Sequence, residues 1–379
     1  MEGNKFEIKY CKKCLLPNTR PGVIIGDDGI SNVWKDSHTL NYNVDWNERK
    51  DQFENLVSRI KKSTSGYDCL VPVSGGKDST WQVLKCIEYG LNVLAVTWKT
   101  PARTLIGQAN LQNLIALGVD HIDYTINPEV EKKFMYKSLI KFGSTALPMH
   151  MALFNIPLKI AVKFNIPLVI WGENSATEYG TDDESLKGLE MNSKWLNKHG
   201  VMHGTTAKDW VDKDLTIKDL TPYFGPSETE LKETDVRAVF LGHFFKWEPE
   251  ISLQKAKKNG FSVRKEGPKT GYYNYADIDC DFISIHHFFK WYKFGFTRLF
   301  DNLAIELKKD RLTMNQAIAI LKKFGIQQPN EDIKKLCKFL NIEQSHFFEI
   351  LESFRNHHIW FVENNKWKIK NFPIKDWKW

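Results

Sequence analysis

The 379-residue chain lacks the features that mark membrane and secreted proteins. No segment approaches the roughly 18 consecutive apolar residues that a membrane-spanning helix needs. Residues 1–9 contain no apolar signal-peptide core, so we expect a cytoplasmic protein. The net charge of +7 suits an anionic substrate or a nucleic acid and does not decide between them. Lysine and arginine are scattered and form no long block, which favours an ordinary solvated surface over a nucleic-acid partner.

Cysteines are few and widely spaced. The six cysteines, at positions 11, 14, 69, 86, 280 and 337, do not form the dense framework of a small disulfide-bonded protein. None lies in the Gly-x-Cys-x-Gly setting of a glutaminase nucleophile. Cys69, Cys86 and Cys337 fall in apolar segments and are most simply small core residues. Cys11 and Cys14 form one Cys-x-x-Cys pair, and a pair alone is a weak zinc signal because structural sites use four ligands.

The most informative feature that the chain does have is a glycine turn. Residues 74–79 read Ser-Gly-Gly-Lys-Asp-Ser, between the apolar run 68–73 and a segment with helical spacing at 79–89. Glycines let the backbone approach an anion, and the free N–H groups of a helix N-terminus bind it. A Walker A loop needs Ser or Thr directly after the lysine, where this chain has Asp78. The pattern therefore predicts a phosphate-binding loop of another kind.

Strand and helix patterns alternate downstream of this loop. We expect strands over 91–98, 121–126, 167–171 and 236–245, with helices over 105–117, from Pro128 onward and around 149–164. Repeated strand–helix–strand units with apolar strands predict an α/β protein with a doubly wound parallel sheet. Such sheets bind ligands at the carboxyl ends of their strands, where segments 74–79, 97–103 and 172–174 fall.

Composition divides the chain into three regions. Residues 1–45 form a small N-terminal Cys-x-x-Cys module, in which we expect turns and short strands. Residues 46–284 carry the glycine turn, beginning with a helix near 46–61, and include a polar segment, 175–235, that we interpret as an insertion or substrate lid. Residues 285–379 are predominantly helical and rich in tryptophan. We expect the terminal tryptophans to pack back on the protein: Trp360, Trp367, Trp377 and Trp379.

The Ser-Gly-Gly-x-Asp-Ser pattern resembles the PP-loop of the N-type ATP pyrophosphatases, whose fold is adenine nucleotide α-hydrolase-like. These enzymes cleave ATP between its α and β phosphates. Segments 11–21, 171–174, 267–271 and 277–287 resemble the N-acetyl sugar amidotransferases, so the likeness runs from about residue 10 to about residue 320. Those enzymes act in lipopolysaccharide (LPS) O-antigen, pseudaminic acid and legionaminic acid biosynthesis. The resemblance implies that ATP adenylates the acetamido oxygen of an N-acetylated sugar or nucleotide sugar, and that ammonia then displaces AMP to leave an acetamidino group.

The resemblance also implies roles for particular residues. Lys77 would neutralise developing charge, and Mg²⁺ would bridge Asp78 to the phosphates of ATP. Glu173 would position the metal or take a proton from ammonia, with helix capping as the alternative. Arg103 would meet a phosphate or a sugar carboxylate, unless it is an exposed surface residue. The pyrophosphate itself would be held by the loop: Ser74, Gly75, Gly76, Asp78 and Ser79.

A glutaminase nucleophile is missing, so the resemblance implies that a separate glutaminase subunit delivers ammonia. Such a subunit would be similar to the one in histidine biosynthesis (HisH-like), with or without its cyclase-like barrel companion (HisF-like).

Family members often carry a second Cys-x-x-Cys pair, which here falls on Ser31 and Trp34. Zinc would need other ligands. We weigh Cys280 with His286 or His287, completing a set with Cys11 and Cys14, against a module without metal.

Two other functions compete with sugar amidation. A PP-loop tRNA thiolation enzyme needs reactive cysteines or an iron–sulfur cluster near the loop. Downstream of the loop this chain offers only Cys86, Cys280 and Cys337, with no close pair. A scaffold that merely channels ammonia would not need the complete Ser-Gly-Gly-Lys-Asp-Ser loop.

Overall fold

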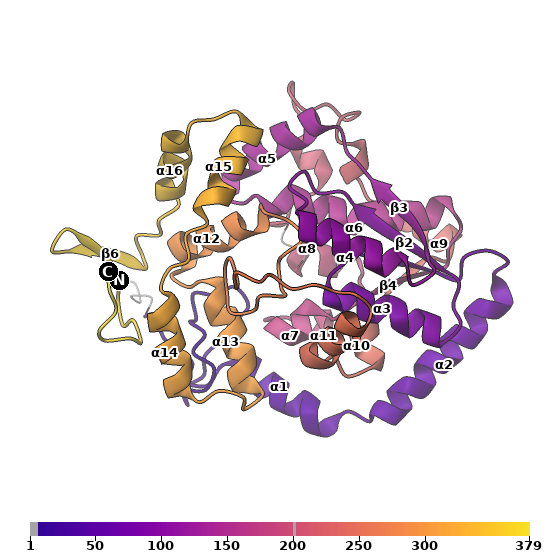
Figure 1. Ribbon diagram of the computed structural model, residues 1–379, viewed down its shortest axis with the longest axis horizontal. Coiled ribbons are helices and arrows are strands. Elements are labelled where there is room, and N and C mark those ends of the chain that lie inside the picture. The colour runs from indigo at the N-terminus through magenta and orange to yellow at the C-terminus, as the bar shows by residue number, and fades with distance from the viewer. Residues whose placement is uncertain (1–6, 200–201) are drawn as a thin grey trace, which may run out of the picture.

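A five-stranded parallel sheet forms the centre of the protein (Figure 1). The computed structural model describes residues 7–199 and 202–379. The strands lie in the order β3-β2-β1-β4-β5, so the chain builds outward from β1 in one direction and then in the other. This is the doubly wound α/β sheet that the sequence predicted. The strands are β1 (Cys69–Pro72), β2 (Val93–Trp98), β3 (Asp120–Tyr124), β4 (Leu168–Trp171) and β5 (Arg237–Phe240).

Helices cover both faces of the sheet because its central strands are apolar on both sides. Cys69 and Val71 of β1 face one core, and Leu70 between them faces the other. The first core includes residues of α2 (Trp46–Ser63), α3 (Lys77–Glu88) and α4 (Leu105–Ile115). The second core includes residues of α5 (Pro128–Phe142) and α6 (Ala146–Lys163).

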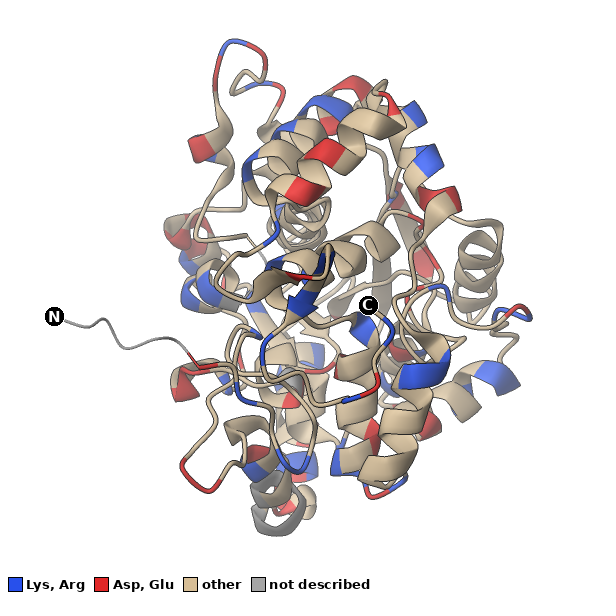
Figure 2. Ribbon diagram, turned by 90° about the vertical axis from the view of Figure 1, so that its left-hand side faces the viewer, with Lys and Arg blue, Asp and Glu red and all other residues tan. Residues whose placement is uncertain are grey.

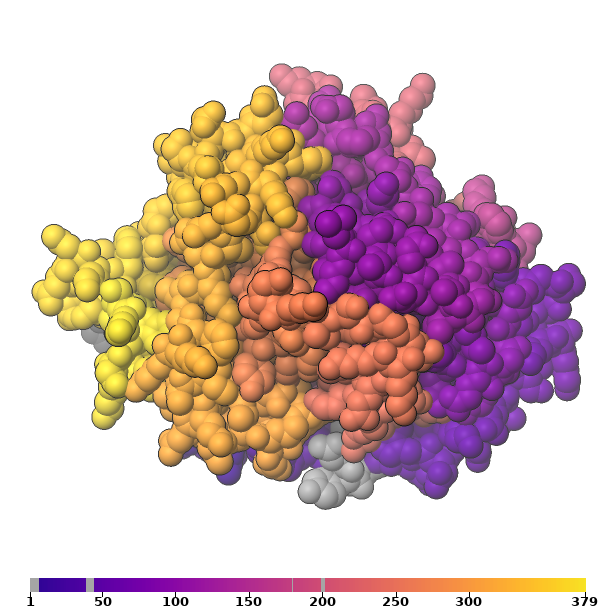
Figure 3. All heavy atoms as spheres, viewed as in Figure 1, coloured from indigo at the N-terminus to yellow at the C-terminus, as the bar shows by residue number. Residues whose placement is uncertain are grey.

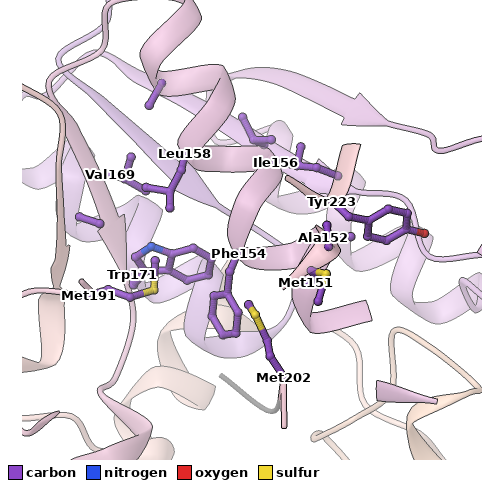
Figure 4. Close-up of a cluster of buried hydrophobic side chains, with 14 of the residues drawn as sticks. Met151, Ala152, Phe154, Ile156, Leu158, Val169, Trp171, Met191, Met202 and Tyr223 are labelled. Carbon is purple, nitrogen blue, oxygen red and sulfur yellow. The ribbon is translucent and has the colours of Figure 1, made fainter. Parts of the chain in front are cut away.

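The segment 175–235 is packed into the second core. It contains α7 (Ser175–Tyr179), η1 (Glu184–Leu186), α8 (Ser193–His199), η2 (Ala207–Trp210), η3 (Thr221–Tyr223) and α9 (Glu228–Glu233). Phe134 of α5 has its ring centre 5.0 Å from Trp210 and 4.8 Å from Tyr223. Figure 4 shows Met191, Met202 and Tyr223 of this segment around side chains of α6 and β4.

The strand predicted over 236–245 is shorter in the structure. β5 ends at Phe240, and residues Leu241–Phe244 form a helical turn, α10. At this turn Gly242 N donates to Gly172 O at 3.0 Å, which brings the chain against the end of β4. The next helix, α11 (Pro249–Lys258), packs on α3. The apolar run continues past the strand because the residues of α10 pack on α2, where the ring of Phe244 lies 5.1 Å from that of Phe53.

The N-terminal module contains a helix where we expected only turns and short strands. In the described part of the module, strand pairing is limited to two isolated antiparallel bridges, between Tyr10 and Pro17 and between Ile25 and Ser31. Ser31 then caps α1 (Asn32–Asn43) by accepting from Trp34 N at 3.3 Å. Between residues 32 and 38 only Val33 is buried, so the sequence lacks the repeated apolar spacing by which a helix is recognised.

The C-terminal region is helical and shares a core with the N-terminal module. Cys11 and Cys14 pack in one cluster with Leu299, Leu303 and Trp377. The region comprises α12 (Ile283–Phe294), α13 (Arg298–Lys308), α14 (Met314–Phe324), α15 (Asn330–Leu340), α16 (Gln344–Ser353) and a hairpin of β6 (Trp360–Glu363) and β7 (Lys366–Ile369).

The terminal tryptophans pack back on the protein, as predicted. The ring of Trp291 lies 5.0 Å from that of Trp360 and 6.2 Å from that of Trp377. The guanidinium of Arg355 lies over Trp360 and Trp367 at 4.8 and 4.9 Å.

Two surface properties agree with the composition. Figure 2 shows basic and acidic residues interspersed over one side of the molecule, without a continuous basic field. Across residues 7–199 and 202–379, none of the helices combines the length and apolar character needed to cross a bilayer.

Candidate functional site

A cavity of about 380 Å³ opens at the carboxyl ends of the central strands. Segments far apart in sequence line it: the loop after β1, the end of β2, the first turns of α6, the end of β4 and residues 277–283. Because β1 lies between β2 and β4, the cavity lies where the sheet reverses its direction of growth. The structure thus brings together the three strand ends that the sequence singled out.

The glycine turn after β1 leaves a helix N-terminus open toward this cavity. Gly75 has φ +83°, and a Cβ there would lie 2.5 Å from Leu111 N, so no other residue fits without displacing α4. Gly76 precedes α3 and provides no side-chain cap for its N–H groups. Uncapped N–H groups at a helix start bind anions. Ser74 and Ser79 line the cavity beside them, so the turn fits a phosphate.

Lys77 and Asp78 form a tight pair at the start of α3. The Lys77 ammonium lies 2.6 Å from Asp78 Oδ2 and is nearly buried. Trp247, in the loop between α10 and α11, donates its indole N–H to Asp78 Oδ1 at 2.9 Å. Lys77 Nζ is 5.2 Å from the Trp247 ring centre and 5.7 Å from that of Tyr275. The orientation of Asp78 therefore depends on two partners, one of them distant in sequence.

Glu173, at the end of β4, faces the same cavity. The pKa of Glu173 is raised to about 8, chiefly by burial and also by the nearby charge of Asp78, while Lys77 acts in the opposite direction. The capping role that we weighed for Glu173 is wrong, because Asn174 caps α7 by accepting from Ala176 N at 3.0 Å. Glu173 is free to act on whatever the cavity binds.

Arg103 is not the exposed residue that we considered as the alternative. Its side chain lines the cavity and is 9% exposed. Two of its nitrogens donate to Asp123 at 2.6 and 2.7 Å, and one also donates to Gln108 at 2.9 Å. Its position is fixed, and its charge is largely balanced by Asp123.

The segment that leads into α12 supplies another part of the cavity wall, through Asp277, Asp279, Cys280 and Ile283. This strip is bonded to the loop after β2: Thr104 N donates to Asp279 O and Asp281 N to Ala102 O, both at 3.0 Å. At Gly107 an added Cβ would lie 2.6 Å from Asp279 Cα, so a glycine permits the contact. Figure 3 shows the chain after α11 lying between the PP-loop domain and the C-terminal helices.

Two carboxylates of this strip differ in their surroundings. Asp277 Oδ2 accepts from Arg298 Nε at 3.0 Å. For Asp279, burial raises the pKa to about 6. Segment 277–287 is one of those that carry the family resemblance, but the sequence analysis gave neither aspartate a role. Trp247, Asp277, Asp279 and His150 of α6 are site residues that our sequence reasoning missed.

The predicted zinc ligands do not come together. Cys11 Sγ accepts from Ser31 N at 3.2 Å, and Cys14 Sγ lies 3.2 Å from Ser31 Oγ. Cys280 instead contacts Thr100 Oγ1 at 2.9 Å, and His286 Nδ1 lies 3.5 Å from Ser144 Oγ. Within the described ranges no group of three or more His, Cys, Asp or Glu side chains could hold a metal ion.

The four-ligand set of Cys11, Cys14, Cys280 and His286 is therefore wrong. The alternative with His287 is wrong too, because His287 Nδ1 bonds to Thr270 Oγ1 at 3.0 Å. The physical reason is that the cysteines belong to different cores. Cys11 and Cys14 pack with α13, whereas Cys280 packs with residues of α5 and α15.

Comparisons with known proteins bear on the C-terminal region and the fold. Residues 269–372 match the family model described as "LPS biosynthesis protein WbpG-like, C-terminal domain". The match covers less than half of the chain and supports a resemblance to LPS biosynthesis proteins over that part of it. None of the curated proteins matches the sequence.

Two solved structures show partial similarity. NMN synthetase from Francisella tularensis is 16% identical, with 51% of this chain and 92% of that chain covered and a TM-score of 0.26. NH3-dependent NAD synthetase from Campylobacter jejuni subsp. jejuni, in complex with the nitrate ion, is 18% identical, with 57% and 96% covered and a TM-score of 0.28. At these TM-scores neither adds to the description of the fold, which rests on the sheet itself.

Proposed function

We propose that this protein is an ATP-dependent amidotransferase that converts the acetamido group of an N-acetylated sugar into an acetamidino group, forming AMP and pyrophosphate. Its pathway would be the synthesis of bacterial surface polysaccharide, such as LPS O-antigen, or of a nonulosonic acid. One observation carries the proposal. The PP-loop and the start of the region that matches the WbpG-like domain line the same cavity, so ATP and a sugar acceptor would meet there.

The PP-loop side suits adenylation of an amide. An amide oxygen is a poor leaving group, so it must first attack the α-phosphorus of ATP and release pyrophosphate. Ser74, Ser79 and the open start of α3 would hold the departing phosphates. Lys77 would turn from Asp78 toward the charge that develops on them.

The residues present also fit Mg²⁺. A bare Asp78 carboxylate would repel phosphate, and a hard divalent cation between them removes the repulsion. Asp78 and Glu173 both line the cavity and offer the carboxylate oxygens that Mg²⁺ prefers. When bound, the ion would neutralise charge on the leaving pyrophosphate.

Another part of the cavity wall suits a sugar. Asp277 and Asp279 can accept hydrogen bonds from hydroxyl or N–H groups. Trp171 and Phe154 of the cavity wall, with ring centres 5.1 Å apart, provide apolar surface for the acetamido methyl group or a sugar face.

Ammonia would come from a separate glutaminase subunit. Cys280 is the cysteine that lines the cavity among the described residues, and burial raises its pKa to about 12. Its thiol therefore stays protonated and does not serve as a glutaminase nucleophile. The same property disfavours the tRNA thiolation alternative, which needs a reactive thiolate beside the PP-loop.

The proposal is tested with purified protein, ammonia, ATP with Mg²⁺ and a panel of acetamido sugars, free and nucleotide-linked. We expect at least one sugar to give AMP, pyrophosphate and an amidine product in equal amounts. The function would be wrong if no sugar stimulates AMP formation. AMP formation with a thiolated tRNA as the product would establish the competing activity instead.

A further inference from the structure

His150 lines the cavity, and the proposed reaction still needs a side chain there that can accept a proton. It lies in the first turns of α6, with Met149, Leu153 and Phe154, and lines the cavity. The PP-loop, Glu173 and the C-terminal strip line the same space from other elements. A histidine is the commonest side chain for moving a proton near neutral pH.

Its contacts fix which ring nitrogen carries the proton. His150 Nδ1 lies 2.8 Å from Ala146 O. A carbonyl oxygen only accepts hydrogen bonds, so Nδ1 must carry the hydrogen and donate it. In a neutral ring Nε2 then has a free lone pair. The ring also packs on Phe154 at 5.9 Å between centres, and Phe154 in turn packs on Trp171.

The surroundings keep this ring neutral. Burial lowers the pKa of His150 below its ordinary value, and the Lys290 ammonium on α12 lowers it further, while the bond to Ala146 O opposes both. His286, also on α12, is itself neutral because burial lowers its pKa. The other charged or titratable groups of the cavity wall are Asp78, Arg103, Glu173, Asp277, Asp279 and Cys280.

The proposed reaction requires a base at its second step. Ammonia adds to the carbon of the adenylated amide, and its nitrogen becomes positively charged. One proton must leave this nitrogen before the C–O bond to AMP breaks and the amidinium cation forms. Two of the hydrogens of ammonia stay on the amidinium, and the third goes to the base. It is the only proton that the reaction releases.

We propose that His150 Nε2 takes this proton from ammonia and that His150 is thus a catalytic residue of amidine formation. The inference rests on the proposed function and assigns the base that the reaction requires. Glu173, which the sequence suggested for this task, belongs to the adenylation side with Asp78 and Lys77.

The test separates the two half-reactions in a His150→Asn variant. The Asn amide can still donate to Ala146 O but offers no basic nitrogen. We expect acceptor-dependent exchange of labelled pyrophosphate into ATP to stay within about twofold of wild type, because adenylation does not use the base. Ammonia-dependent amidine formation should fall roughly 100-fold or more, the usual contribution of general base catalysis. Exposed His358, replaced by Asn, is the matched control and should change neither rate.

Hydroxylamine distinguishes a base from a residue that only shapes the cavity. The nitrogen of its adduct is more acidic than that of the ammonia adduct, so it loses its proton to water more readily. We expect His150→Asn to slow the hydroxylamine reaction by about tenfold or less, compared with the larger loss for ammonia. The role of His150 would be overturned if the variant loses the same factor in rate with ammonia and with hydroxylamine. It would also be overturned if pyrophosphate exchange and amidine formation fall equally, or if amidine formation is unchanged. Absence of exchange in the wild-type protein with every acetamido sugar would instead overturn the proposed function.

Discussion

The two sides of the cavity are built in different ways. The PP-loop side, made of Ser74, Asp78, Ser79 and Gln82, comes from one short stretch of chain whose shape is set by a glycine turn and a helix start. The C-terminal side, made of Asp277, Asp279, Cys280 and Ile283, is a strip held on the loop after β2. The first side is formed by local backbone geometry, and the second depends on contacts with residues about 170 positions earlier.

This difference indicates how the two sides can change independently. A phosphate cradle made from backbone N–H groups recognises the same pyrophosphate whatever the acceptor is. A strip held by a few hydrogen bonds can carry other side chains without disturbing that cradle. We therefore expect changes on the PP-loop side to affect adenylation with every acceptor, and changes on the C-terminal side to affect acceptor use alone.

The largest effect is expected from Asp78→Asn. The change removes the carboxylate that would hold Mg²⁺ and leaves buried Lys77 without its charged partner. Pyrophosphate release should fall by roughly 10²–10³-fold, as when one electrostatic contact to the transition state is lost. Asp214→Asn is the control, since Asp214 pairs with Lys137 at an exposed position. An equal loss in both variants would show that the charge change, and not the site, matters.

Gly107→Ala should separate the two sides. The added methyl group would meet the backbone of Asp279 at 2.6 Å and displace the C-terminal strip. We expect kcat/KM for the sugar to fall by about tenfold to a hundredfold, because small misplacements of an acceptor are costly. Binding of ATP, followed by calorimetry, should change little.

The control for this variant is Gly188→Ala, where an added Cβ meets no atom nearer than 3.9 Å. If Gly107→Ala weakens ATP and sugar binding to the same extent, the independence of the two sides is wrong.

Trp247→Phe tests the distant contact to the PP-loop. The variant keeps an aromatic ring beside Lys77 but removes the N–H that donates to Asp78 at 2.9 Å. Loss of a hydrogen bond to a charged group costs about 1.5–3 kcal/mol, which converts to roughly 10- to 150-fold at most. Lys77 still holds Asp78, so we expect the lower limit, seen as a higher KM for ATP-Mg. An unchanged KM with every acceptor would exclude Trp247 from the site.

The smallest effect is on stability. The pKa of Glu173 is raised to about 8 from an ordinary value of 4.5, so the folded protein holds a proton there that the unfolded chain releases. The stabilisation that comes from this bound proton is fully present below pH 4.5 and is lost as the pH rises through about 8. Between pH 6 and 9, without nucleotide, the Tm of wild type should fall more than that of Glu173→Gln. For a chain of this size we expect a difference of about 2–4 °C. Parallel Tm curves would contradict the assignment.

The sequence was sufficient for the parts of the site that are local. The glycines and the following helix predicted the turn and the open helix start after β1, and the ends of apolar strands located Glu173 and Arg103. Asp123, which fixes Arg103, and Trp247, which fixes Asp78, contribute through contacts that no spacing in the chain reveals. His150 falls in the apolar helix around 149–164, and nothing in the sequence pattern marks it as a residue of the cavity.

The zinc prediction failed for a related reason. The spacing of Cys11 and Cys14 correctly placed them together, but it carried no information about Cys280 or His286. Which core each distant residue joins is decided by packing: the N-terminal module packs on α13, and Cys280 packs with α5 and α15. α1 was missed because a polar helix with one buried residue near its start lacks the periodic signal.

The most direct test of the central claim follows the acetamido oxygen. The acceptor sugar is labelled with a heavy oxygen isotope in its acetamido group and converted with ammonia and ATP-Mg, and AMP, pyrophosphate and the sugar are analysed by mass spectrometry. The account predicts that the label appears in the phosphate of AMP, while the sugar gains one nitrogen and loses the oxygen. Label that remains in the sugar, or that passes to water or pyrophosphate, would contradict it.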